Sequence, residues 1–116
     1  MIMLRIAFLM TLAVWLTGCA APTLYSRTHY EELVYLSYAK PEKATPEMQV
    51  KQMQADIRRA QSANKLLPPG FHAHLGYLYY QLGQLKEAQQ EFQSEKAQFP
   101  ESAVFMDRLL ANLDKK

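Results

Sequence analysis

The sequence predicts an all-α protein with about five short helices. Apolar residues recur at three- and four-residue spacings through most of the chain, which is the period of amphipathic helices. Gln, Glu, Lys, Ala and Leu are abundant, and only four glycines occur. Prolines and glycines break the chain into short segments, and no segment alternates apolar and polar residues as a strand would. The loops between the segments have lengths typical of helical hairpins.

The first two helices are expected at residues 30–38 and 46–64. In the first of them, Glu31 and Glu32 occupy the first turn, where the helix dipole favours acidic side chains. In the second, Thr45 is placed to cap the helix, with Pro46 at its first position. One face of this second helix carries an apolar stripe, and we expect Asp56 and its charged neighbours to face away from it. The stripe consists of Val50, Met53, Ile57 and Ala60.

Three further helices are expected at residues 71–82, 85–99 and 102–113. The first of these is apolar on nearly all sides, so we expect it to pack against neighbours on two sides. Gly83 and Pro100 end the helices before them, and Ser102 is placed to cap the last helix.

The N-terminal segment has the pattern of a signal peptide. One positive charge, on Arg5, precedes the apolar run at residues 6–16, which is well short of the ~20 apolar residues that span a bilayer. The sequence Leu16-Thr17-Gly18-Cys19 then resembles the bacterial lipobox. This resemblance implies transfer of diacylglyceryl to the Cys19 sulfur, cleavage before Cys19 and acylation of the new amino terminus. The alternative is a secreted protein with a free cysteine near an ordinary cleavage site.

These features divide the chain into a lipoprotein signal peptide (1–18), a lipidated tether (19–28) and a single helical domain (29–116). Ala20, rather than aspartate, follows the cysteine. In enteric-type sorting this implies the inner leaflet of the outer membrane, with the domain facing the periplasm.

Charge and cysteine content exclude several classes of protein. The formal net charge is +2 before removal of Arg5, and a value so close to neutral argues against nucleic-acid binding and against electrostatic docking to membranes. Cys19 is the only cysteine, so no disulfide forms within the chain. The small helical domain at residues 29–116 must therefore gain its stability from packing.

Residues 70–100 resemble a tetratricopeptide repeat, which is a helix–turn–helix of 34 residues. The matching residues are Leu75-Gly76, Tyr79, Leu82-Gly83, Ala88, Phe92 and Pro100. Small residues at Gly76 and Ala88 let two antiparallel helices approach closely. His72 and Glu95 depart from the pattern, because the family usually has Trp and Ala there. The alternative is an unrelated helical bundle.

The whole mature chain is also similar to a family of small Gram-negative lipoproteins known as domain of unknown function 4810. The similarity lies in Leu24-Tyr25, Tyr30, residues 68–76, residues 99–103 and Phe105-Met106. Arg27-Thr28 stands where family members usually have Trp-Gly, so the chain departs from the family pattern at that pair. The resemblance implies genetic neighbours that are also envelope lipoproteins, one of them similar to the curli-secretion channel. It implies no enzyme activity and no known ligand.

The sequence contains no arrangement that predicts a metal site, a cofactor site or a catalytic site. His72 and His74 are two residues apart, so on a helix they point away from each other and cannot share one ion. No nucleophile or carboxylate pair has a catalytic context. Glu87, Glu91 and Glu95 follow one another at four-residue spacing, which is typical of a solvated helix face.

Four residues are candidates for binding a partner: Ala73, Tyr77, Tyr80 and Gln81. They lie on the side of the 71–82 helix that lines the concave groove in the repeats that this segment resembles. The alternative is that the two tyrosine rings pack against the stripe at residues 50–57. We therefore expect a non-catalytic, lipid-anchored adaptor that binds another envelope protein. The alternatives are a small-ligand-binding or enzyme-accessory subunit and a purely structural assembly factor.

Overall fold

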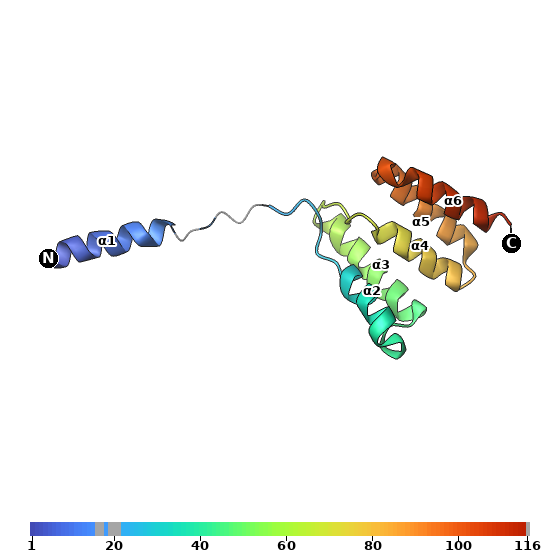
Figure 1. Cartoon of the computed structure of the whole chain (residues 1–116), viewed down its shortest axis with the longest axis horizontal. Helices are drawn as coiled ribbons and strands as arrows, with labels where there is room; N and C mark the ends of the chain where they lie inside the picture. Colours follow the sequence, from blue (N-terminus) through green and yellow to red (C-terminus); the bar gives the residue numbers. More distant parts are fainter. Residues whose placement is uncertain (16–17, 19–21, 116) are drawn as a thin grey trace.

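The computed structural model describes residues 1–15, 18 and 22–115, and its fold is all-α (Figure 1). No strand occurs among these residues. The helices are α1 (Ile2–Trp15), α2 (Tyr30–Ala39), α3 (Pro46–Ser62), α4 (Phe71–Gln81), α5 (Leu85–Gln98) and α6 (Ala103–Leu113), with short 3-10 turns η1 (Pro41–Lys43) and η2 (Pro100–Ser102). All five helices expected after the signal peptide are confirmed, and each begins and ends close to the expected residues.

Residues 6–15 of the segment expected to be the core of the signal peptide lie within α1, and Leu16 lies outside the described residues. Over the described part of the chain, no helix has both the length and the hydropathy needed to cross a bilayer.

The two expected helix caps have different outcomes. Thr45 caps α3 as expected, because its hydroxyl accepts a hydrogen bond from the Met48 amide at 3.4 Å. Ser102 does not cap α6, so that expectation is wrong. Its hydroxyl donates to the Phe99 carbonyl at 2.7 Å instead, because residues 100–102 form the turn η2 before the helix begins.

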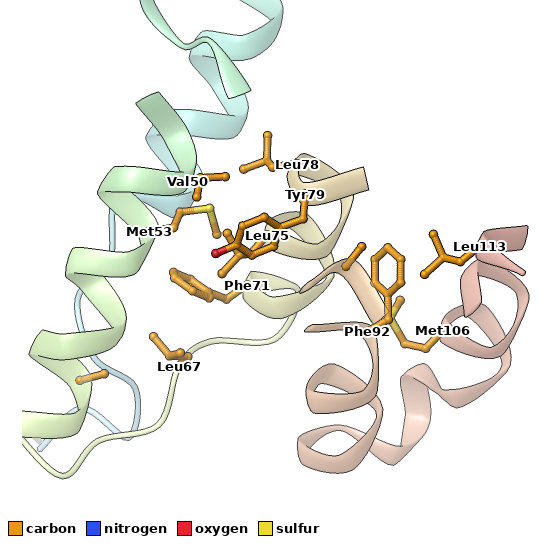
Figure 2. Packing of buried hydrophobic residues seen from close by; sticks show 12 residues of the cluster. Val50, Met53, Leu67, Phe71, Leu75, Leu78, Tyr79, Phe92, Met106 and Leu113 are labelled. Carbon is orange, nitrogen blue, oxygen red and sulfur yellow. The ribbon is translucent and has the colours of Figure 1, made fainter. Parts of the chain in front are cut away.

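Helix α4 is the centre of the core and packs on two sides, as its apolar composition predicted. It lies between α3 and α5, and α6 covers the far side of α5 (Figure 1). The side chains at the core are drawn in Figure 2, where those of α4 face Val50 and Met53 of α3. Figure 2 also shows Phe92 of α5 facing Met106 and Leu113 of α6.

The closest approach of two helices occurs between α4 and α5. A Cβ atom added to Gly76 would lie only 2.6 Å from the Phe92 ring and 3.2 Å from the Ala88 carbonyl oxygen. Gly76 and Ala88 are buried, and Ala88 is completely so. The two small residues expected at this hairpin therefore allow the contact.

Successive helices run in alternating directions, so the domain has two distinct ends (Figure 1). One end holds the start of α2, α4 and α6 and the end of α3 and α5; we call it the tether end, because residues 22–29 enter there. The far end holds η1 and the turn between α4 and α5.

Residues 23–26 are in contact with the domain, although they lie inside the range expected to be tether. Ser26 is buried and its amide donates to the Leu66 carbonyl at 2.8 Å, while Tyr25 and Leu66 form an isolated parallel bridge. The Tyr25 ring lies 6.4 Å from that of Phe99. The Lys65 ammonium donates to the Thr23 hydroxyl at 3.0 Å. The domain therefore holds the chain from Thr23 onward.

Candidate functional site

A cavity of about 220 Å³ opens between α2 and α4, and we call it the α2–α4 groove. Both helices begin at the tether end, where the Tyr30 ring of α2 lies 6.1 Å from the Phe71 ring and 5.5 Å from the His74 ring of α4. The groove has polar and apolar walls in similar measure. It is lined by Val34, Ser37 and Tyr38 of α2, Gln49 of α3, and His74, Tyr77, Leu78 and Gln81 of α4.

The structure brings two of the four candidate residues together in this groove. Tyr77 is 49% exposed, and its hydroxyl accepts a hydrogen bond from the Gln81 amide at 3.3 Å. Ala73 and Tyr80 do not line the groove. Both are half-buried and pack against the hydrophobic core. The four candidate residues therefore do not form one exposed surface, because Tyr77 and Gln81 are exposed whereas Ala73 and Tyr80 are half-buried.

The tyrosine of α4 that faces the stripe of α3 is Tyr79. Its ring is buried in the core beside Val50 and Met53 (Figure 2). Its hydroxyl accepts a hydrogen bond from the Gln54 amide at 2.8 Å. This residue occupies the space that the alternative interpretation assigned to Tyr77 and Tyr80.

Tyr38 is a groove residue that was not expected from the sequence. Its side chain is 87% exposed near the end of α2 and lines the groove opposite α4. Its place in the groove depends on the tertiary structure, because the whole of α3 separates α2 from α4 in the sequence. Only the packing shows that Tyr38 and Tyr77 border the same cavity.

His74 is a partly buried residue of the groove. Its Nε2 and the Gln49 side-chain oxygen are 2.9 Å apart, and its ring lies 5.5 Å from that of Tyr30. Burial lowers the pKa of His74 below its ordinary value, because the charged ring loses hydration there. At neutral pH the ring is therefore uncharged and donates from Nε2 to Gln49.

This lowered pKa predicts a loss of stability in mild acid. The unfolded chain takes up a proton at His74 below about pH 6.5, whereas the folded chain does so only at lower pH. The uncharged His74 ring therefore gives its full contribution to stability above about pH 6.5. This contribution decreases as the pH falls toward the pKa of His74 in the folded chain. Thermal melting from neutral to mildly acidic pH should therefore show a smaller decrease in Tm for His74→Gln than for the wild type. Identical slopes for the two proteins would contradict this assignment.

A buried carboxylate holds the start of α4. Glu95, on α5, is 3% exposed, and its two oxygens accept hydrogen bonds from the Gly70 amide at 2.7 Å and the Ala73 amide at 3.3 Å. Amides at a helix N-terminus lack partners within the helix and favour negative charge. Burial, with the Glu95 and Glu31 carboxylates, raises the pKa of the Tyr30 hydroxyl, so the phenol stays protonated beside this site.

A second buried carboxylate holds the start of α2 in the same manner. Asp56, on α3, is completely buried. It accepts hydrogen bonds from the His29 amide at 2.7 Å and from Arg59 at 3.2 Å, and it lies 2.9 Å from His29 Nδ1. In both hairpins, an acid on the second helix therefore binds the start of the first helix.

These acids correct two expectations. The solvated face expected for Glu87, Glu91 and Glu95 is wrong for the last two, because Glu95 is buried and Glu91 lies 2.6 Å from His72 Nδ1 with little exposure. Asp56 was expected to face away from the core and is instead buried in it. The sequence held one indication of a buried acid: Glu95 stands where the tetratricopeptide repeat usually has a small residue.

The two histidines of α4 contact different helices. His72 contacts Glu91 of α5, and His74 contacts Gln49 of α3. Across residues 1–15, 18 and 22–115, no group of three or more His, Cys, Asp or Glu side chains is placed to hold a metal ion. Cys19, the expected lipidation site, lies outside the described residues.

One family model matches the chain, over residues 24–109, and its description is Domain of unknown function (DUF4810). No curated protein matches the sequence, and no solved structure matches it. The matched range begins within residues 23–26, which contact the domain, and ends in α6, so it covers α2 to α5 and the first part of α6.

Proposed function

We propose that this chain, which belongs to the DUF4810 family, is a non-catalytic, lipid-anchored adaptor of the bacterial cell envelope. It binds a segment of another envelope protein in the α2–α4 groove. The observation that carries this proposal is the pair of exposed tyrosines, Tyr38 and Tyr77, that border one groove from two helices. Tyrosine combines a large apolar face with one hydrogen-bonding group at low entropic cost, and it is enriched at binding hot spots.

The groove has the chemistry of a peptide-binding surface. Ser37 and Gln81 offer hydrogen-bonding groups to a main chain and Val34 offers an apolar contact, while Gln49 and Leu78 line the groove as buried residues. At about 220 Å³ its volume is below the ~300–1,000 Å³ of typical small-molecule pockets. This comparison favours a protein segment over the alternative, a small-ligand-binding or enzyme-accessory subunit.

We propose that the helical hairpins form a tetratricopeptide-like arrangement, which fits the same assignment. Helices α2 and α4 are the first helices of two successive hairpins, and the first helices line the binding groove in such repeats. The contact of Gly76 with Phe92 and Ala88 fits the packing that the repeat pattern requires within one hairpin. In this arrangement, α6 covers the end of the array.

The proposed anchor places the groove near its partner. The lipobox at residues 16–19 predicts acylation of Cys19, and Ala20 after it predicts the periplasmic face of the outer membrane. Confinement to one membrane raises the effective concentration of two anchored proteins, so a groove of modest affinity is sufficient. The family resemblance makes a neighbouring lipoprotein similar to the curli-secretion channel the first partner to test.

The test is capture of that partner by groove variants. Tyr77→Ala should weaken capture by about 1–2 kcal/mol, roughly tenfold in affinity, because the ring is an exposed anchor. Tyr35→Ala is the matched control, since Tyr35 is 69% exposed on α2 and does not line the groove. Both variants should keep the wild-type Tm. Equal capture by the two variants, or copurification of a metabolite in place of a protein, would contradict the proposal.

A further inference from the structure

Four large apolar side chains are exposed at the tether end of the domain. The exposed fractions are 66% for Leu24, 51% for Leu66, 69% for Val104 and 59% for Phe105. They come from three segments: the docked residues 23–26, the loop after α3 and the first turn of α6. We call these four residues the end patch.

The first two of these segments are in contact with each other, and the first also contacts Phe99, which lies shortly before the third. The Ser26–Leu66 hydrogen bond and the bridge between Tyr25 and Leu66 join the first segment to the second. The Tyr25 ring packs against Phe99, which directly precedes η2 and α6. The end patch is therefore part of one structured end of the domain (Figure 1).

The far end has a different surface. Its exposed residues in η1, in the α4–α5 turn and at the end of α6 are mostly charged or amide-bearing: Lys40, Glu42, Lys43, Gln84, Lys86, Glu87, Asp114 and Lys115. Tyr38, at 87%, and Met48, at 54%, are the large hydrophobic side chains exposed near this end. Exposed aliphatic and phenylalanine side chains of the helical domain thus concentrate at the tether end, and such concentrations mark interaction sites.

The length of the tether determines what this end can reach. The four residue-to-residue steps from Cys19 to Thr23 span at most about 14 Å, even when fully extended. Thr23 is bound to Lys65, so the free chain ends there. Helix α3 alone has 17 residues and is about 25 Å long. An acyl anchor at Cys19 therefore keeps the tether end close to the bilayer, and the far end extends away from it.

We propose that the end patch rests on the lipid surface that holds the anchor, with Leu24, Leu66 and Phe105 entering the headgroup region. This inference rests on the proposed acylation of Cys19. Apolar side chains at such a surface bury area at the boundary between headgroups and acyl chains. Contact through the patch fixes the domain upright, so that the far end and the outer part of the α2–α4 groove face the periplasm.

The test uses the acylated full-length protein in phosphatidylethanolamine–phosphatidylglycerol vesicles. Cys19 is the only cysteine and its thiol is consumed by the anchor, so Leu66→Cys and Phe105→Cys each supply a single site for a fluorescent label. Nitroxide-labelled phospholipid should quench most of the emission at both positions. A label at Gln84→Cys, exposed at the far end, should keep its emission.

Equal quenching at the two ends, or none at Leu66 and Phe105, would overturn the inference. A label at Leu66 that is shielded from aqueous iodide and is not quenched by lipid would also overturn it, because a protein or a second copy would then cover the patch. Flotation with the vesicles separates the two proposals. Protein that fails to float refutes the anchor and this inference together, whereas protein that floats without quenching at Leu66 refutes the inference alone.

Discussion

Replacing Cys19 with alanine should release the protein from the membrane completely. Each buried CH₂ of an acyl chain contributes about 0.8 kcal/mol, so the chains on one cysteine supply far more binding energy than any surface contact of this domain. The sequence offers no second thiol to carry the anchor. The end patch alone should not retain the variant. Fractionation with a carbonate wash, followed by immunoblotting of the soluble and membrane fractions, measures the change.

Ala20→Asp is the matched control for this experiment. It leaves Cys19 in place, so the variant should remain anchored, with its sorting shifted to the inner membrane in an enteric-type host. A Cys19→Ala protein that stays in the washed membrane fraction would rule out the lipid anchor.

Glu95→Ala should destabilise the domain more than any exposed substitution. The change leaves the Gly70 and Ala73 amides, at the start of α4, without their acceptors. Each buried amide without a partner costs about 1–3 kcal/mol. In a domain of this size, 1 kcal/mol corresponds to roughly 4–8 °C in Tm, so we expect a decrease of about 10 °C or more. Thermal unfolding followed by circular dichroism measures it.

Two further variants show whether the carboxylate itself is responsible. Gln90→Ala, at an exposed position on the same helix, should change stability by no more than about 0.5 kcal/mol. Glu95→Gln keeps one acceptor oxygen and should fall between the wild type and Glu95→Ala. A Glu95→Ala protein that melts like Gln90→Ala would show that the capping role assigned to Glu95 is wrong.

The helices could be predicted from the sequence because their signals are local. Prolines and glycines end the segments, and Thr45 caps α3 with a hydroxyl three residues from the amide that it binds. The apolar stripe of α3 and the all-round apolar composition of α4 predicted the layers of the core correctly. Ser102 shows the limit of such signals, because a 3-10 turn at residues 100–102 displaced its hydroxyl from the capping position.

The candidate groove could be predicted only in part. Tyr77 and Gln81 were expected at a groove and line one, but Ala73 and Tyr80 are half-buried against the core. The spacing along α4 defines which residues share a face. It does not define how closely the neighbouring helices approach that face, and this distance decides whether a ring is covered.

The sequence by itself determined the all-α fold class, the limits of the helices, the candidate lipidation site at Cys19 and the close approach at Gly76 and Ala88. Each of these depends on residues that are near one another in the chain or within one hairpin. The tertiary structure alone decided that Asp56 and Glu95 are buried acids that bind the starts of α2 and α4. It also decided that Tyr38 and Tyr77 border one groove and that residues 23–26 pack against Leu66 and Phe99. An acidic residue on a helix has the same local pattern whether it faces water or an amide, and only the packing of distant segments distinguishes the two.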